Sequence, residues 1–384
     1  MRRSTEITGV SDTPFTSFRR AAAALAAAAV LAGAGAPASA QTPRTVRINL
    51  PPVANRPGVV LIADQFNNRV IEVDRLGNIT WQFGRGPTDF TPNSIIGVND
   101  AQRVGPLTLM AGTGTPPNTV PTCQLPNGCP DNRVLLVNRS GHIVWQYGTF
   151  GVTGSGPDQL DTPTQATYLP SGNILITDQG NQRVIEVDMM KNILWQYGTT
   201  GVAGSAPDQL SSPNSAELLE SGHVLIADEA NDRAIEVDRG HAVIAEFSAG
   251  GTVNGVAFAS RLPNGDTLLT DAGNSRVVEV DPHDAVVWEY LTNTDPGSNA
   301  APQPTRAIRL ATGNTIISDQ FNHRVIIVNM AKHIVASWGN INRSGYSPYS
   351  TTAGLFAPYD AKVIGDFTGL TPPFDHDGDP DDHF

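Results

Sequence analysis

Short apolar runs, separated by Gly, Asn and Asp, follow one another along most of this chain. One group of runs covers Asn173 to Asp178, Arg183 to Asp188 and Asn192 to Tyr197. Because these runs are rich in Val, Ile and aromatic residues and are bounded by turn formers, they predict three antiparallel β-strands. An apolar segment that begins at Pro163 and ends in the turn Pro170-Ser171-Gly172 predicts a fourth strand ahead of them. The pattern therefore predicts a unit of four antiparallel strands.

A polar signature, Asp-x-x-Asn-x-Arg, marks the hairpin between the second and third strands of each unit. A charge-assisted hydrogen bond between Asp and Arg, and the ease with which Asn adopts turn conformations, would fix this loop. Because a residue needed for chemistry at one site has no reason to recur in every unit, we interpret the signature as structural. The alternative is a ring of carboxylates or guanidinium groups that faces a ligand. The copies are Asp64/Asn67/Arg69, Asp178/Asn181/Arg183, Asp228/Asn231/Arg233, Asp271/Asn274/Arg276 and Asp319/Asn322/Arg324, with a degraded copy ending at Arg133.

The number and order of the units predict how the chain closes. The set from Val59 to Phe83 has no first strand before it, and the last first strand, Pro358 to Ile364, has no partners after it. We therefore expect an all-β fold over residues 58–364, a six-bladed β-propeller of four-stranded antiparallel blades, in which the C-terminal strand completes the N-terminal blade. Such closure leaves no long unpaired sheet edge. The six first strands are placed at Pro92, Pro163, Pro213, Val253, Pro304 and Pro358.

Aromatic residues recur at two positions of the outer strands. The two positions are two residues apart, which places both side chains on one face of a strand. We interpret the aromatics as wedges that pack neighbouring blades together, and the stacking of sugars or bases is the alternative. The first series is Trp81, Trp145, Trp195 and Trp288, with Ala245 and Ala336 in the other units, and the second is Phe83, Tyr147, Tyr197, Phe247, Tyr290 and Trp338.

The N-terminal segment has the features of a signal peptide, which we assign to residues 1–40. Arg19 and Arg20 precede the apolar stretch Ala21 to Leu31, and Ala38-Ser39-Ala40 has the small residues of a cleavage site. The stretch is shorter than the roughly 20 apolar residues that span a bilayer. We expect an exported protein, periplasmic or secreted, with a lead-in at 41–57 and no membrane span. The twin-arginine and general secretory routes both remain open.

The charge balance disfavours a polyanionic partner. The 384 residues carry a formal net charge of −12, and without residues 1–40, which hold four Arg and two acidic residues, 21 basic residues face 35 acidic ones, a net charge of −14. Nucleic-acid binding needs a basic surface that displaces counterions. We therefore expect no nucleic-acid partner. We also expect a monomer, whose ligand is an unidentified protein or small molecule.

Two cysteines, Cys123 and Cys129, flank a Pro126-Asn127-Gly128 turn within a long excursion from Gly112 to Asp131. In an oxidising compartment we expect them to form a disulfide, and a metal or redox pair is the alternative. The excursion interrupts a hairpin of the second blade. It is either a lid or protein contact or a tolerated surface insertion.

The candidate site follows from the positions at which blades differ. First strands and hairpin loops share one face around the central channel, where a few placed polar groups make a binding site. Two positions after the start of each first strand stand Ser94, Gln165, Ser215, Gly255, Arg306 and Asp360, and hairpin loops contribute Gln65, Gln179, Glu229, Ala272 and Gln320. We select Arg306, Asp360, Gln165 and Glu229 as candidate ligand-binding residues. The alternative for Arg306 and Asp360 is an ion pair that seals neighbouring blades.

The histidines and the C-terminus bear on cofactors. A catalytic zinc wants about three protein ligands in one place, whereas His142, His241, His283 and His333 fall in turns of four different units and only His323 lies in a hairpin loop. We expect no metal and no cofactor. Calcium is the one alternative, because Asp375 to Asp382 is similar to the first half of a calcium loop. We expect residues 365–384 to be an acidic tail that is disordered.

One repeat unit carries a family resemblance. Tyr197-Gly198 and Gly201, then Pro207-Asp-Gln-Leu210 and Pro213, then Gly222 to Arg233, resemble the NHL repeat, whose members form six-bladed propellers that bind protein or RNA or act as zinc lyases. The Leu-Pro-Ser-Gly-Asn turns and the following Trp-Gln-Tyr are also similar to exported arylsulfotransferases. The zinc lyases and the arylsulfotransferases need inward-facing histidines, and this sequence has no histidines that can be matched to those positions.

The resemblance, with the chemistry of the loops, leaves two functional hypotheses. The first is an exported NHL-repeat propeller that acts as a binding or interaction module through the channel-mouth face. The alternative is an extracytoplasmic propeller enzyme, a lyase, hydrolase or arylsulfotransferase-like protein, with its site at the channel mouth. The sequence assigns no catalytic residue to the second hypothesis.

Overall fold

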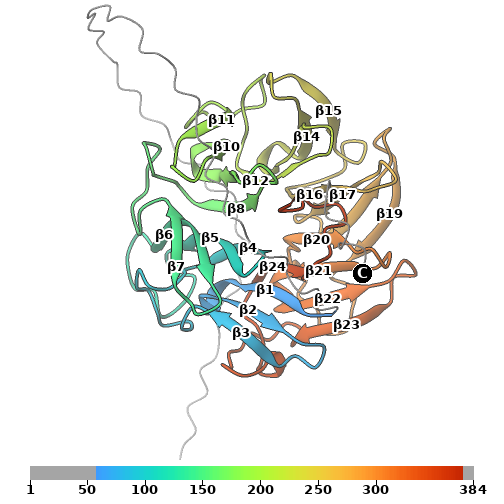
Figure 1. Cartoon of the computed structure of the whole chain (residues 1–384). Helices are drawn as coiled ribbons and strands as arrows, with labels where there is room; N and C mark the ends of the chain where they lie inside the picture. Colours follow the sequence, from blue (N-terminus) through green and yellow to red (C-terminus); the bar gives the residue numbers. More distant parts are fainter. Residues whose placement is uncertain (1–57, 375–384) are drawn as a thin grey trace, which may run out of the picture. The chain divides into compact units, whose positions relative to one another are not determined.

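Six four-stranded antiparallel sheets form a ring in the computed structural model, which describes residues 58–374 (Figure 1). The expected signal peptide, the lead-in and Asp375 to Asp382 lie outside the described residues. The predicted fold class, a six-bladed β-propeller, is confirmed. No helix within residues 58–374 has the length and apolarity to cross a membrane.

The blades are numbered here from the N-terminal one, and their strands are given from the channel outward. Blade 1 holds β24 (Pro358–Val363), β1 (Val60–Asp64), β2 (Arg69–Val73) and β3 (Ile79–Phe83). Blade 2 holds β4 (Val98–Val104), β5 (Leu107–Thr115), β6 (Cys129–Asn138) and β7 (Ile143–Tyr147). Blade 3 holds β8 (Pro163–Tyr168), β9 (Ile174–Asp178), β10 (Arg183–Val187) and β11 (Ile193–Tyr197).

The second half of the ring repeats this order. Blade 4 holds β12 (Pro213–Leu218), β13 (Val224–Asp228), β14 (Arg233–Val237) and β15 (Val243–Phe247). Blade 5 holds β16 (Val256–Arg261), β17 (Thr267–Asp271), β18 (Arg276–Val280) and β19 (Val286–Leu291). Blade 6 holds β20 (Arg306–Arg309), β21 (Thr315–Asp319), β22 (Arg324–Val328) and β23 (Ile334–Gly339).

The ring closes through blade 1, as the strand count predicts. β24 pairs antiparallel with β1, and Ala361 is the partner of Ile62 in that register. The C-terminal strand therefore occupies the innermost position of the N-terminal blade. Each remaining blade is built from consecutive strands, so the junction within blade 1 is the one that joins the two ends of the propeller.

The repeated Asp, Asn and Arg fix the hairpin between the second and third strands. In blade 3, Asp178 Oδ2 accepts hydrogen bonds from Asn181 Nδ2 and Arg183 Nε, both at 2.8 Å. The short 3-10 helix Gln179–Asn181 lies between them, and the residue with left-handed backbone is Gln182, not the Asn. The structural interpretation of the signature is thus confirmed, but the Asn acts as a side-chain donor. The other 3-10 helices are Gln65–Asn67, Glu229–Asn231, Gln320–Asn322 and Thr351–Ala353.

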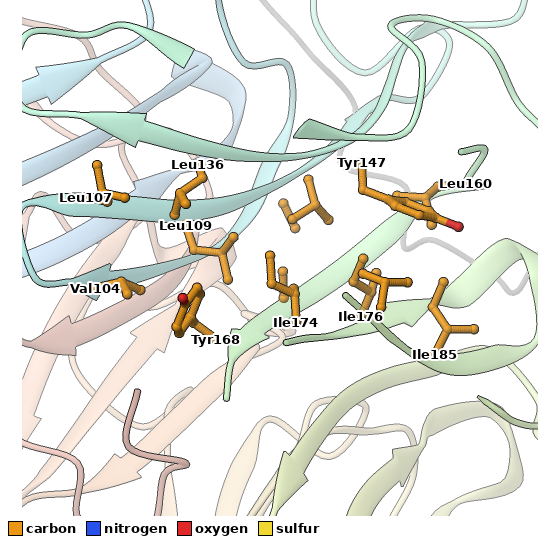
Figure 2. Close-up of a cluster of buried hydrophobic side chains, with 14 residues drawn as sticks. Val104, Leu107, Leu109, Leu136, Tyr147, Leu160, Tyr168, Ile174, Ile176 and Ile185 are labelled. Carbon is orange, nitrogen blue, oxygen red and sulfur yellow. The ribbon is translucent and has the colours of Figure 1, made fainter. Parts of the chain in front are cut away.

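The hydrophobic core lies between successive blades. Figure 2 shows Leu109 and Leu136 of blade 2 facing Tyr168, Ile174 and Ile176 of blade 3, and all of them are buried. Strands alternate their side chains between two faces, so each blade offers one apolar face to each neighbour. The core is consequently divided among the interfaces of the ring.

The outer-strand tryptophans join neighbouring blades, which confirms their packing role. Each indole Nε1 donates a hydrogen bond to a backbone carbonyl in the turn before the outer strand of the next blade. Trp338 occupies the Phe/Tyr position of blade 6, yet its indole makes the same kind of contact. The pairs are Trp81 with Arg139, Trp145 with Met189, Trp195 with Arg239, Trp288 with Met330 and Trp338 with Asp74, at 3.0–3.2 Å.

Candidate functional site

The innermost strands β24, β4, β8, β12, β16 and β20 surround a central channel (Figure 1). We call the end that carries the Asp-Asn-Arg hairpins the mouth, and the opposite end the base. All four candidate residues lie on the channel strands or the mouth hairpins. Three of them, Arg306, Asp360 and Gln165, have side chains at most 1% exposed, whereas Glu229 is half-buried.

The register of the inner strands corrects two predicted positions. β4 begins at Val98 and β16 at Val256, so blades 2 and 5 place Asp100 and Phe258 in the ring that holds Gln165, and not Ser94 and Gly255. Sequence reasoning placed these strands too early because it anchored them at Pro92 and Val253. An alanine directly follows the channel position in every blade and would have located it: Ala101, Ala166, Ala216, Ala259, Ala307 and Ala361.

This ring of side chains ties successive blades together. Each tie joins a side chain of one blade to the backbone N–H of the alanine in the next, and the small alanine lets the strands approach. Asp360 and Gln165 therefore have structural partners within the protein. The bonds run from Ala101 N to Asp360 Oδ2 (3.1 Å), Ala166 N to Asp100 Oδ2 (3.3 Å), Ala216 N to Gln165 Oε1 (2.9 Å) and Ala259 N to Ser215 Oγ (3.3 Å).

Lys362 joins the acidic members of this ring. Its Nζ lies 2.6 Å from both Asp100 Oδ1 and Asp360 Oδ2. Within residues 58–374 the ion pair of Asp360 is thus made with Lys362, and not with Arg306. Burial raises the pKa of Asp100 to about 6, although Lys362 acts in the opposite direction. Burial also disfavours the charge of Lys362, but Asp100 and Asp360 outweigh it and raise the pKa of the amine.

Arg306 crosses the channel instead. Its guanidinium donates to Thr164 O of blade 3 (3.2 Å), to Asn214 Oδ1 of blade 4 (3.1 Å) and to Ala257 O of blade 5 (3.2 Å). The rings of Phe258 and Tyr359 lie about 5 Å from the guanidinium carbon, at 5.2 and 5.1 Å. Arg306 therefore fills the channel below the mouth.

Asn214 connects Arg306 to the mouth. Its Nδ2 donates to Tyr359 Oη and to Glu229 Oε2, both at 2.8 Å. Tyr359 belongs to blade 1 and Asn214 to the opposite blade 4, so this pair spans the channel. Burial raises the pKa of Glu229, and burial together with the Glu229 charge raises the pKa of Tyr359 to about 12. Asn214 and Tyr359 were missed, because nothing local in the sequence indicates a contact across the ring.

Amide side chains and the blade 2 excursion cover the rest of the mouth. Gln65 donates to Asn99 (2.7 Å) and accepts from Gln320 (2.9 Å). Cys123 and Cys129 form a disulfide, as predicted. Val120 and the disulfide pack in a buried cluster with Phe66, Ile96 and Ala357, and Phe90, Phe150, Phe321 and Phe356 pack against it. The excursion thus rests on the hairpins of blades 1 and 6, and leaves those of blades 3 to 5 outside this cluster.

The base of the channel is occupied by residues assigned to the acidic tail. Thr371 donates to Glu217 Oε2 through both its backbone N (2.8 Å) and its Oγ1 (2.6 Å), and Gln102 donates to Thr371 O (3.3 Å). The enclosed cavity between this segment and the inner strands holds about 20 Å³, roughly the space of one water molecule. Residues 365–374 are therefore an ordered plug, and the expectation of a disordered tail does not apply to them.

His323 and His241 lie outside the channel, and each contacts other residues of the protein. His323 Nδ1 accepts from Ala357 N (3.2 Å), and His241 lies beside Trp195, Tyr197 and Asp208 at the junction of blades 3 and 4. Among residues 58–374 no three His, Cys, Asp or Glu side chains gather in a way that could hold a metal ion. The arrangement can offer hydrogen bonds and one half-buried carboxylate at the mouth.

The sequence matches no protein-family model and no curated protein. Solved structures do match the fold. A Bacteroides caccae protein of unknown function superimposes with a TM-score of 0.51 at 14% identity, over 73% of this chain and 93% of that one. A virginiamycin B lyase from Staphylococcus aureus gives a TM-score of 0.46 at 12% identity, over 76% and 87% of the two chains. At 14% identity the likeness to the Bacteroides caccae protein shows the fold alone.

Proposed function

We propose that this chain is an exported β-propeller that acts as a binding module, with its ligand held at the mouth of blades 3 to 5. The observation that carries the proposal is the filled channel. Arg306, Lys362 and Thr371 occupy it from mouth to base through hydrogen bonds to other channel residues. A ligand therefore meets a shallow polar surface, and not an enclosed pocket.

The open part of the mouth has the polar groups that a ligand needs. Glu229 and Gln179 are half-buried, and their side chains lie within 3.4 Å of each other. Asn214 and Tyr359 lie directly beneath them. Export agrees with the disulfide, which persists in oxidising compartments. The resemblance to NHL repeats supports the same role, because propellers with these repeats include modules that bind protein or RNA.

One observation favours an enzyme as the second candidate. Glu229 and Tyr359 are two titratable groups that share the amide of Asn214, each at 2.8 Å. Paired groups with shifted pKa values recur in active sites. Product analysis of each compound that binds the mouth would separate the two candidates, because a binding module releases its ligand unchanged.

A thermal-shift screen tests the proposal. The mature protein is screened against metals, calcium, aryl sulfates, sugars, amines and amidated peptides, since a ligand that binds the folded state raises the melting temperature. The same screen is run on Ala272→Trp and Gln179→Trp, which place a bulky ring at the mouth, and on Ala331→Trp, which places it in an exposed turn at the base. Unfolding curves establish that each variant is folded.

The expected result is a ligand that stabilises the wild type and Ala331→Trp but neither mouth variant. Ligands that stabilise all four proteins equally would show that binding occurs elsewhere and would contradict the proposal.

A further inference from the structure

Glu229 is the residue at which the mouth departs in charge from the repeat. Gln65, Gln179 and Gln320 occupy the same position, directly after the repeated aspartate, in blades 1, 3 and 6. Their amides take part in hydrogen bonds within the mouth. Blade 4 replaces the neutral amide with a carboxylate. The replacement introduces a negative charge that its counterparts in blades 1, 3 and 6 lack.

An ion-pair partner for this charge is absent from the described part of the chain. Glu229 Oε2 accepts from Asn214 and Gln179, whereas Oε1 has no hydrogen-bond donor among residues 58–374. Six other glutamates in this range form ion pairs with arginine: Glu72, Glu186, Glu236, Glu246, Glu279 and Glu289. Glu229 is thus a partly desolvated carboxylate with one oxygen held in place and the other open.

Blade 5 leaves room beside this carboxylate. It has Ala272 where blades 1, 3, 4 and 6 have Gln or Glu, and Ala257 where the other blades have Asn, Thr or Tyr. Gly255 has a left-handed backbone (φ 68°), and a Cβ built on it would lie 3.8 Å from Glu229 Cγ and 3.9 Å from Glu229 Oε1. Gly255 therefore brings no side chain of its own against the open oxygen.

The surrounding charges decide which ligand fits. Asp232 is exposed, accepts from Gly255 N at 2.7 Å, and adds a second negative charge near Glu229. Arg306 lies on the far side of Asn214, and its positive charge lowers the pKa of Glu229 more than Asp232 raises it. Its hydrogen bonds are directed to Asn214 and to backbone carbonyls, so no N–H of Arg306 reaches the open oxygen. Because opposite charges attract most strongly where water is partly excluded, an anionic group is disfavoured here and a cationic group is favoured.

We infer that Glu229 receives the ammonium or guanidinium group of a cationic ligand, such as a lysine or arginine side chain presented by a peptide. This inference rests on the proposed binding function and specifies its ligand. The ligand's N–H groups would donate to Glu229 Oε1, and Gln179 and Asn214 would keep the carboxylate oriented. The acidic surface of the whole protein would steer such a ligand toward the mouth.

The chain offers matched variants. Glu229→Gln installs the residue that the repeat uses in three other blades, and its amide oxygen still accepts from Asn214. Glu220→Gln removes the same charge from an exposed turn at the base. The probes are a capped Gly-Lys-Gly tripeptide, its arginine counterpart, a norleucine counterpart that lacks the charge, and a glutamate counterpart.

Binding of each probe to the mature protein is measured by calorimetry at concentrations up to about 10 mM, which detects a Kd near 1 mM. We expect the lysine or arginine probe to bind the wild type and Glu220→Gln equally, and Glu229→Gln at least tenfold more weakly. The norleucine and glutamate probes should not bind. Equal affinity for Glu229→Gln, equal affinity for norleucine, or no binding by either cationic probe would overturn the inference.

The results that would overturn the proposed binding function differ from those that would overturn the cationic ligand. If the screen yields a neutral or anionic ligand that Ala272→Trp blocks and Glu229→Gln does not, the mouth is a binding site and only the cationic assignment is wrong. If no ligand responds to the mouth variants, the binding function itself is wrong.

Discussion

Pro302 stands where the other five blades place a backbone N–H, and Asp319 Oδ1 is in consequence buried without a hydrogen-bond donor among residues 58–374. In those blades the repeated aspartate accepts from the residue two positions before the inner strand. The carbonyl of Pro302 still accepts a hydrogen bond from the hairpin, because Phe321 N donates to it at 2.8 Å. The five donors are Phe356, Ile96, Asp161, Ser211 and Asn254, at 2.7–2.8 Å.

Replacing Pro302 with Ala should therefore stabilise the protein. A hydrogen bond to a charged group contributes about 1.5–3 kcal/mol, and losing the proline's restriction of the unfolded chain costs about 0.4–1 kcal/mol. We expect a net gain of about 1 kcal/mol in the free energy of unfolding, measured by urea denaturation at pH 7.5. Ser211→Pro, the reverse change at Asp228, should destabilise the protein.

The gain from Pro302→Ala should depend on pH. Burial raises the pKa of Asp319 to about 6, above the value of about 4 in an unfolded chain. The folded state is therefore penalised by the ionised, under-bonded carboxylate above pH 6, and the penalty fades as the pH falls toward 4. The difference between variant and wild type should be full above pH 6 and small at pH 4. A gain that is unchanged across this range would contradict the assignment to Asp319.

Lys362→Met should weaken the closure of the ring. It removes the cation that lies 2.6 Å from both Asp100 and Asp360, and removing one partner of a buried ion pair costs about 3–5 kcal/mol. Because Lys362 lowers the pKa of Asp100, which is already raised to about 6, its loss should raise that pKa further. Protonation at pH 5 would then relieve part of the penalty, so we expect a larger loss at pH 7.5 than at pH 5.

Urea denaturation at pH 7.5 and pH 5 measures the loss in free energy of unfolding for Lys362→Met. Lys332→Met is the control, because Lys332 is exposed in a turn at the base. Equal losses for both variants, or a loss for Lys362→Met that grows on acidification, would show that the cluster does not hold the junction.

The fold could be predicted from the sequence because its determinants recur. Asp178, Asn181 and Arg183 have counterparts in other blades, and an unmatched first strand at Pro358 has one geometric solution. Local patterns place such elements because the hydrogen bonds that fix a hairpin lie within a few residues. Strand starts are less certain, and anchoring on Pro92 instead of Val98 shifted the channel position from Asp100 to Ser94.

The site could be predicted only in part. Glu229 was selected because blades differ at its position in the mouth hairpins, and its role stays a prediction. Asn214 and Tyr359 were missed because their contact joins residues 145 positions apart, and neither has a distinctive local pattern. The plug of residues 365–374 was missed because its contacts, too, join residues far apart in the sequence. Thr371 belongs to a stretch rich in Gly and Pro with no strand period, and its order comes from the buried Glu217 to which it donates.

The Trp338 indole should stabilise the junction between blades 6 and 1. Trp338 is 4% exposed, and its Nε1 donates to Asp74 O at 3.0 Å. Trp338→Ala should lower the free energy of unfolding by about 3–5 kcal/mol. Trp338→Phe keeps most of the ring but loses the hydrogen bond, and should cost about 0.5–1.5 kcal/mol for that bond alone. Denaturation measures both values, and equal costs for Phe and Ala would show that packing of the ring contributes nothing.

Thr371→Val should destabilise the base of the channel. The change keeps the shape of the side chain but removes one of the two donors to Glu217 Oε2. It also removes the acceptor of Leu218 N, and an unsatisfied buried group costs about 1–3 kcal/mol. Burial already raises the pKa of Glu217, and loss of a donor to its charged form should raise it further. The part of the loss that arises at Glu217 should therefore be largest at pH 7.5 and fade as the carboxylate protonates in acid, whereas the part that arises at Leu218 N should not change with pH. Thermal unfolding at both pH values measures it against Thr294→Val, whose side chain is exposed. A loss confined to acid, or one matched by Thr294→Val, would mean that the plug does not stabilise the ring through Glu217.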